Sequence, residues 1–152
     1  MERRAVLSTL RLGLIVLSLT LAAALRADER QIVLVVNTNS PVLELNPIEI
    51  RKLFLGLPVQ RDNRPLVPVR NSSDRQLEQV FLQDVVAMSQ SAYDRRILAH
   101  TLQHGSPRPL DLQSRDQVLA KLYSDRFAVS YVWIDDAAGN PRLRVLRVIW
   151  SE

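Results

Sequence analysis

The chain has 152 residues, of which 47% are hydrophobic and 24% are charged, and its formal net charge is +4. This length and composition suit one globular domain with its own core, and they exclude a largely disordered chain. Because the sequence contains no cysteine, a disulfide scaffold and any site built on thiolates are excluded as well.

The first 27 residues have the pattern of a secretory signal peptide. Three arginines flank an apolar stretch from Leu12 to Leu25, and Ala27 follows it. The stretch is shorter than the roughly 20 residues that a membrane-spanning helix needs. We therefore expect residues 1–27 to be a signal peptide and residues 28–152 to be a single periplasmic domain. The alternative is an uncleaved N-terminal anchor, through which the chain would contact the membrane.

Most of the net positive charge lies in that first segment. Removing residues 1–27 takes away four arginines and one glutamate, so the 20 basic and 16 acidic residues become 16 and 15. A net charge of about +1 gives no reason to expect a nucleic-acid partner, since such partners are bound by basic surfaces.

The first strand and helix have clear local signals. The run from Ile32 to Val36 is apolar and rich in valine, which is typical of a strand buried on both faces. A helix is expected to begin after Asn46, because asparagine is a good N-cap, proline follows it, and Glu49 completes a capping box. Gly56 marks the end of this helix.

A second strand is expected over residues 66–69, after a turn at Asp62 and Asn63. Its proline, Pro68, suggests a position near the edge of the sheet, because proline cannot donate a ladder hydrogen bond.

Three helices follow in the predicted order. Ser72 and Ser73 are N-cap candidates for the first, whose apolar positions recur at helical spacing as far as Met88. Ser89 or Ser91 begins the second, which runs to about His104 and is stopped by Gly105. Ser114 begins a shorter third helix.

The chain ends in two predicted strands, over residues 127–133 and 143–150. The segment 135–141 between them is rich in Asp, Gly, Asn and Pro, which indicates a hairpin-like connection. The order of elements predicts one α/β domain with a mixed sheet flanked by helices.

Catalytic and metal-binding motifs are absent from the sequence. It has no nucleophile elbow, no phosphate-binding loop and no dinucleotide fingerprint. His100 and His104 stand one helical turn apart, but Thr101 follows His100 where a zinc hydrolase has its glutamate. We predict no catalytic residue, no metal and no cofactor.

The segment around Arg70 is the candidate ligand site. A strand leads directly into a helix start with Arg70, Ser72 and Ser73, so a guanidinium, two hydroxyls and helix amides could face one oxyanion. Thr38 and Ser40, after the first strand, are expected at the same carboxyl edge of the sheet. The alternative is that the serines cap the helix and Arg70 is a surface charge.

Several segments resemble the phosphate-type substrate-binding proteins of bacterial ABC importers, and small single-lobe periplasmic proteins related to them. The similarity covers about residues 31–133. Its motifs are the strand 32–37, Lys52-Leu53-Phe54-Leu55-Gly56, the strand 66–69, Phe81-Leu82 and Ala128-Val129-Ser130-Tyr131-Val132. The resemblance implies one lobe of a type II periplasmic-binding-protein fold in a periplasmic protein.

The resemblance also implies roles for site residues. Arg70 with Ser72 and Ser73 corresponds to the arginine and helix start that wrap the oxyanion, and Thr38 or Ser40 to hydroxyls of the first loop. Asp74 stands where a neutral donor is expected, so its carboxylate could accept a proton from hydrogen phosphate or could repel an anion.

The sequence is compatible with two functions. The first is a non-enzymatic module that binds phosphate or a related oxyanion for an ABC permease or an envelope sensor. The alternative is an interaction protein built on the same fold, with no small ligand.

Overall fold

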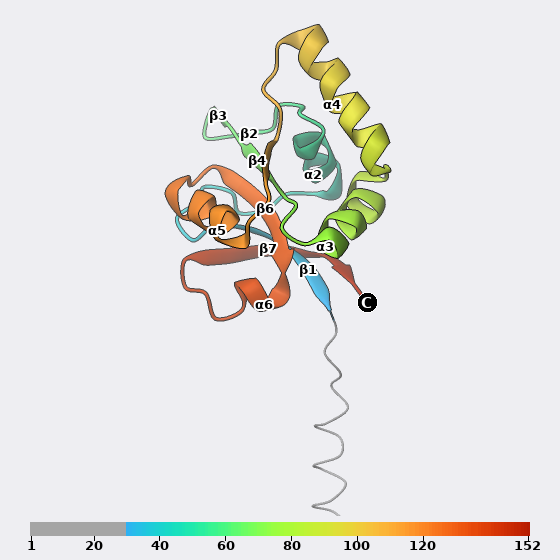
Figure 1. Cartoon of the computed structure of the whole chain (residues 1–152). Coiled ribbons are helices and arrows are strands. Elements are labelled where there is room, and N and C mark those ends of the chain that lie inside the picture. The colour runs from blue at the N-terminus through green and yellow to red at the C-terminus, as the bar shows by residue number, and fades with distance from the viewer. Residues whose placement is uncertain (1–29) are drawn as a thin grey trace, which may run out of the picture.

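The computed structural model describes residues 30–152, so the predicted signal peptide, residues 1–27, lies outside the described residues. Within the described part, no helix is both long and apolar enough to cross a membrane. Figure 1 shows a sheet with helices packed on both of its faces.

A mixed sheet of five strands organises the described chain, in the spatial order β5-β4-β6-β1-β7. Strand β4 is parallel to both of its neighbours, β5 and β6, whereas β1 is antiparallel to β6 and β7. The expected α/β domain with a mixed sheet is confirmed. The strands are β1 (Gln31–Asn37), β4 (Val67–Asn71), β5 (Leu110–Leu112), β6 (Ala128–Trp133) and β7 (Leu143–Ser151).

The last two strands do not form the predicted hairpin. Strand β1 lies between β6 and β7, and the connection contains a short helix, α6 (Ile134–Ala137). Because β1 is antiparallel to both, β6 and β7 run in the same direction. The turn-forming residues of segment 135–141 are compatible with both connections. They allow the chain to cross over β1 as well as to reverse its direction beside β6.

Strand β1 is buried on both faces, as its sequence predicts. Residues Ile32 to Val36 are all fully inaccessible to solvent. Ile32, Leu34 and Val36 face a large apolar cluster that includes residues of α2 (Pro47–Phe54), of α3 (Arg75–Val80) and of the segment after α3. Val33 and Val35 face a smaller cluster, under α5 (Arg115–Ser124). Alternation along the strand therefore supplies both layers of the core.

Helix α2 (Pro47–Phe54) begins as predicted. Asn46 accepts a hydrogen bond from the Glu49 amide, and the Glu49 carboxylate accepts one from the Asn46 amide, which completes the capping box. Gly56 follows the helix with a positive φ of 79°, a conformation that glycine adopts without strain. The predicted turn at Asp62 and Asn63 joins β2 (Gln60–Arg61) to β3 (Arg64–Pro65) in a small hairpin.

The prediction that Pro68 marks an edge strand is wrong, since β4 lies between β5 and β6. Strand β5 pairs with β4 from Val69 onward, however, and Pro68 is paired with β6 alone. Proline is accommodated because one side of the strand is still open at that position.

The helical region after β4 also differs from the expectation. The N-cap of α3 (Arg75–Val80) is Asp74, and neither Ser72 nor Ser73 caps it. The expected single helix continues instead as the π-helix η1 (Phe81–Val86), which ends at Ala87 in the left-handed conformation. Helix α4 (Gln90–His104) is capped by Ser89 at its start and by Gly105 at its end, as predicted.

Ala87 should be a stabilising site for glycine. Its φ of 58° and ψ of 48° place it in the left-handed region, which costs an L-residue with a Cβ about 1–2 kcal/mol. After the entropy that glycine adds to the unfolded chain, we expect Ala87→Gly to raise the free energy of unfolding by about 0.5 kcal/mol. Ala99→Gly, in the exposed interior of α4, should instead lower it by about 1 kcal/mol. Urea denaturation of both variants checks the opposite signs.

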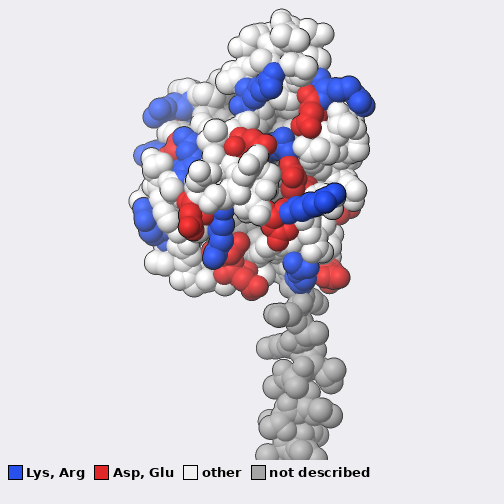
Figure 2. All heavy atoms as spheres, in the orientation of Figure 1, with Lys and Arg blue, Asp and Glu red and all other residues white. Residues whose placement is uncertain are grey.

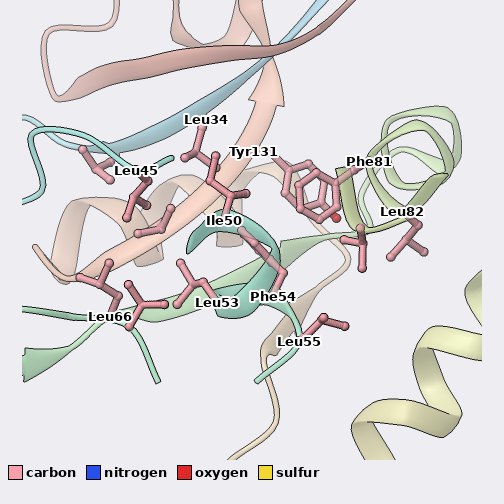
Figure 3. Close-up of a cluster of buried hydrophobic side chains, with 14 of the residues drawn as sticks. Leu34, Leu45, Ile50, Leu53, Phe54, Leu55, Leu66, Phe81, Leu82 and Tyr131 are labelled. Atoms are coloured by element: carbon pink, nitrogen blue, oxygen red, sulfur yellow. The ribbon is translucent and has the colours of Figure 1, made fainter. Parts of the chain in front are cut away.

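Figure 3 shows the larger apolar cluster. Phe54, Phe81 and Tyr131 come from α2, η1 and β6 and meet at its centre. The Phe81 and Tyr131 rings are stacked, with centroids 3.6 Å apart, and Phe54 packs edge-on against Phe81 at 4.8 Å. This contact packs η1 against the sheet, and so it holds the helical segment that begins at Asp74.

Candidate functional site at the end of strand β4

The start of α3 is already occupied by a carboxylate of the chain itself. Asp74 Oδ1 accepts hydrogen bonds from the backbone amides of Gln76, at 2.8 Å, and Leu77, at 3.1 Å. The indole Nε1 of Trp133 donates to Asp74 Oδ2 at 3.1 Å. The helix amides that could hold an external anion are therefore bound to an internal one.

Asp74 is ionised at neutral pH. Burial alone would raise its pKa, but the hydrogen bonds from Leu77, Trp133 and Gln76 and the nearby Arg30 together hold the pKa below its usual value. A negative charge therefore stands at the helix start, and it opposes the approach of phosphate.

The hydroxyls of the two predicted site serines are also used within the chain. Ser72 Oγ donates to the Asp111 carboxylate. Ser73 Oγ donates to Asn71 Oδ1 at 2.6 Å, and the Ser73 amide donates to the same oxygen at 3.2 Å. The hydroxyl protons are not directed toward an external ligand.

Arg70 is a buried residue and not a surface charge. It is 6% exposed, its guanidinium is paired with the Glu78 carboxylate, and it lies over the Tyr93 ring at 4.6 Å. Two further carboxylates approach Arg70 Nη1, those of Asp94 at 3.6 Å and Asp111 at 3.8 Å. Three acids thus surround one cation, which neutralises the charge that an oxyanion would need.

Thr38 and Ser40 lie at the opposite edge of the sheet. Because β1 is antiparallel to β6 and β4 is parallel to β6, the ends of β1 and β4 point in opposite directions. Thr38 Oγ1 donates to the Pro141 carbonyl at 2.8 Å, and the buried Ser40 Oγ accepts from the Val42 amide at 3.2 Å. The expectation that these residues join Arg70, Ser72 and Ser73 at one edge is wrong.

A cavity of about 390 Å³ lies beside the start of α3, and it is acidic. Asp74, Asp135 and Asp136 line it together with Trp133 and Arg30. Arg30 lies over the Trp133 ring at 4.3 Å. Asp136 forms an ion pair at 2.8 Å with Arg115, which does not line the cavity. Burial raises the pKa of Asp136. The cavity therefore does not provide the basic surroundings that phosphate prefers.

The surface gives no indication of a basic patch on the face that includes this region. Figure 2 shows Lys and Arg side chains interspersed with Asp and Glu side chains there.

The two histidines of α4 were considered as metal ligands, and the rings of His100 and His104 lie 4.8 Å apart. Among residues 30–152, no cluster of three or more His, Asp or Glu side chains could hold a metal ion.

Two residues at the start of α3 were not predicted from the sequence: Asp74, which caps the helix, and Trp133, which donates a hydrogen bond to Asp74. A signal for the first was present, because aspartate is as good an N-cap as serine and Asp74 directly precedes the helix. No local signal could have paired Trp133 with Asp74, since 59 residues separate them.

The comparison with known structures agrees with this architecture. The chain is similar to the crystal structure of an ABC-type phosphate transport receptor from Vibrio cholerae, with a TM-score of 0.59 and 14% sequence identity. The match covers 78% of this chain and 46% of the receptor chain, so this chain spans about half the length of the protein it matches. No protein-family model and no curated protein matches the sequence.

This similarity shows that the described residues share the fold of about half of that receptor chain, a mixed sheet flanked by helices. The similarity at 14% identity extends to the fold alone.

Proposed function

We propose that the protein is a single-lobe module of the periplasmic-binding-protein fold that acts by binding another protein and not by enclosing an anion. One observation carries this proposal: the carboxylate of Asp74 already accepts the hydrogen bonds of the α3 amides, at the helix start that the sequence predicted as an oxyanion site. The ion pair of Arg70 with Glu78 also supports protein binding over anion binding, because the Glu78 carboxylate compensates the charge of the guanidinium.

The proposal places the module in the bacterial periplasm, with residues 1–27 as its signal peptide. Its partner is then a protein of the cell envelope, such as an ABC permease or a sensor. This part rests on the sequence pattern of the first segment and on the similarity to a transport receptor.

A second candidate is oxyanion binding by Arg70, Ser72 and Ser73, with Thr38 and Ser40 in a separate place. The structural similarity to a phosphate receptor favours it. A lobe that is open to solvent on one side would bind weakly, because solvent screens the charges and the ligand is not enclosed.

Thermal unfolding with phosphate distinguishes the two functions. Ligand at about 100 times its dissociation constant stabilises a protein by about 2.7 kcal/mol, which raises the Tm of a domain of this size by several degrees. We expect millimolar phosphate, sulfate and chloride to give the same small shift at equal ionic strength. A rise in Tm that is specific to phosphate would favour the second candidate and contradict the first.

Asp74→Gly should create the anion site that Asp74 closes. Glycine is tolerated as an N-cap at a cost of a few tenths of a kcal/mol, and it leaves the amides of Gln76 and Leu77 open. We therefore expect phosphate to raise the Tm of this variant by more than it raises that of the wild type.

Asp135→Asn is the matched control for this variant, because it removes a charge from the same cavity without opening the amides. An equal gain in both variants would mean that net charge, and not the occupied helix start, excludes phosphate.

Protein binding itself is checked by photo-crosslinking in cells that secrete the protein, from exposed surface positions. We expect one recurring envelope protein, captured equally at high and low phosphate. A capture that depends on phosphate would contradict a role without a small ligand.

A further inference from the structure

An apolar groove of about 370 Å³ lies away from the α3 start, and nothing in the proposed anion chemistry uses it. We call it the proline groove. It is bounded by the end of α2, the beginning of β4 and the segment that joins α4 to β5 (Figure 1). Leu53 and Leu66, which Figure 3 shows at one side of the core, form part of its wall.

Four prolines keep this groove open. Pro58, Pro65, Pro68 and Pro107 all line it. Their rings fix the backbone φ and have no flexible side chain that could fold into the space. An apolar hollow with rigid walls is present before any partner arrives, so little ordering entropy opposes binding.

The groove also borders an open stretch of strand. Strand β5 pairs with β4 from Val69 onward, so Val67 and Pro68 line the groove with no strand beside them on that side. This open side extends the apolar wall of the groove but offers no backbone donor, because the Val67 amide donates to the Phe127 carbonyl and Pro68 has no amide proton. Recognition of a partner therefore depends on side chains that fill the groove.

One charged side chain, that of Arg108, lines the groove. Arg108 is exposed and has no hydrogen bond or ion pair with any residue from 30 to 152. It also borders a smaller cavity beside Asp94 and Asp111, but those carboxylates approach Arg70 instead. The guanidinium of Arg108 is therefore available to a carboxylate from outside.

We propose that the proline groove binds a short segment of a partner protein in which a large apolar side chain stands next to an aspartate or glutamate. The apolar side chain fills the groove and the carboxylate pairs with Arg108. This inference rests on the proposed protein-binding function, and it names the surface and the chemistry of the partner.

Selection from a random peptide library displayed on phage, with the purified full-length domain as bait, tests the proposal. We expect enriched peptides to share a large apolar residue beside an acidic one. Synthetic copies of these peptides should bind Arg108→Glu about tenfold more weakly than wild type, because a like charge then faces the peptide carboxylate. Copies with lysine in place of the acidic residue should regain affinity for Arg108→Glu.

Two matched variants complete the test. Arg75→Glu reverses the charge of an exposed, unpaired arginine on α3, away from the groove, and should leave peptide affinity unchanged. Leu110→Ser removes part of the apolar wall at a position that is 40% exposed, and should weaken binding without unfolding the domain. Circular dichroism confirms that each variant is folded.

Three results would overturn the proposal: no enrichment, enriched peptides without an acidic residue, or equal loss in Arg108→Glu and Arg75→Glu. A fourth result would overturn the proposed role of the groove and leave the protein-binding function intact. It is that, in cells, the partner is crosslinked from other surfaces of the domain and not from positions in the groove. Phosphate-specific stabilisation of the wild type would instead contradict the protein-binding function, whatever the groove binds.

Discussion

Replacing Arg70 with alanine is expected to lower the free energy of unfolding by about 3–5 kcal/mol. The substitution leaves the Glu78 carboxylate, which is largely buried, without the guanidinium that compensates it. It also removes the cation over the Tyr93 ring. Since domains of this kind have total stabilities of about 5–15 kcal/mol, the midpoint of urea denaturation should fall steeply.

Two further variants separate the ion pair from general damage at Arg70. Replacing both partners, as Arg70→Met with Glu78→Leu, removes the buried charges together and should recover much of the lost stability. Arg75→Ala, at an exposed position on the next helix, should change the free energy of unfolding by less than about 0.5 kcal/mol. A loss of under about 1 kcal/mol in Arg70→Ala would mean that Arg70 is not the structural cation described here.

Phe81→Ala is expected to cost about 3–5 kcal/mol, since it empties the centre of the larger apolar cluster. The Phe81 side chain is fully buried, is stacked on Tyr131 and contacts Phe54 edge-on. Because the cavity would lie between η1 and the sheet, the change should also loosen the start of α3. Urea denaturation gives the loss, and near-ultraviolet circular dichroism reports the packing of the aromatic side chains, Tyr131 among them.

The conservative variant Phe81→Leu tests the same site with a smaller cavity. It should cost less than Phe81→Ala and keep the domain folded under native conditions. If the two substitutions had equal and small effects, the contact of η1 with the sheet would not be the element that fixes the candidate site.

The Arg70 prediction bears on function, because it distinguishes two roles of Arg70: a contact with a ligand and a structural cation. A ligand-binding arginine on the surface can be replaced with little loss of stability. A buried arginine with three carboxylates around it cannot. The stability of Arg70→Ala thus decides between the two roles without any ligand.

Local signals in the sequence predicted elements that depend on neighbouring residues. The capping box at Asn46 and Glu49 formed as expected, and α4 begins at Ser89 and ends at Gly105. The valine-rich run of β1 gave a strand buried on both faces. In each case, residues within a few positions supply the hydrogen bonds or the periodicity, so the sequence carries the information directly.

The candidate site could not be predicted to the same extent. The sequence predicted a site at the end of β4 and treated Arg70, Ser72 and Ser73 as donors that face outward. Their acceptors are Glu78, Asp111 and Asn71, of which Asp111 comes from another part of the chain. A donor is available to a ligand when nothing else binds it, and contacts between distant segments determine that.

The sequence by itself determined the caps of α2 and α4, the apolar strand β1 and the alternation that supplies both core layers. The tertiary structure alone decided that β1 lies between β6 and β7 and that Thr38 lies far from Ser72. It also decided that Trp133 reaches Asp74 across 59 residues. The physical reason is that caps and periodicity are fixed by nearby residues, whereas strand order, burial of charge and closure of a site depend on packing the whole chain around one core.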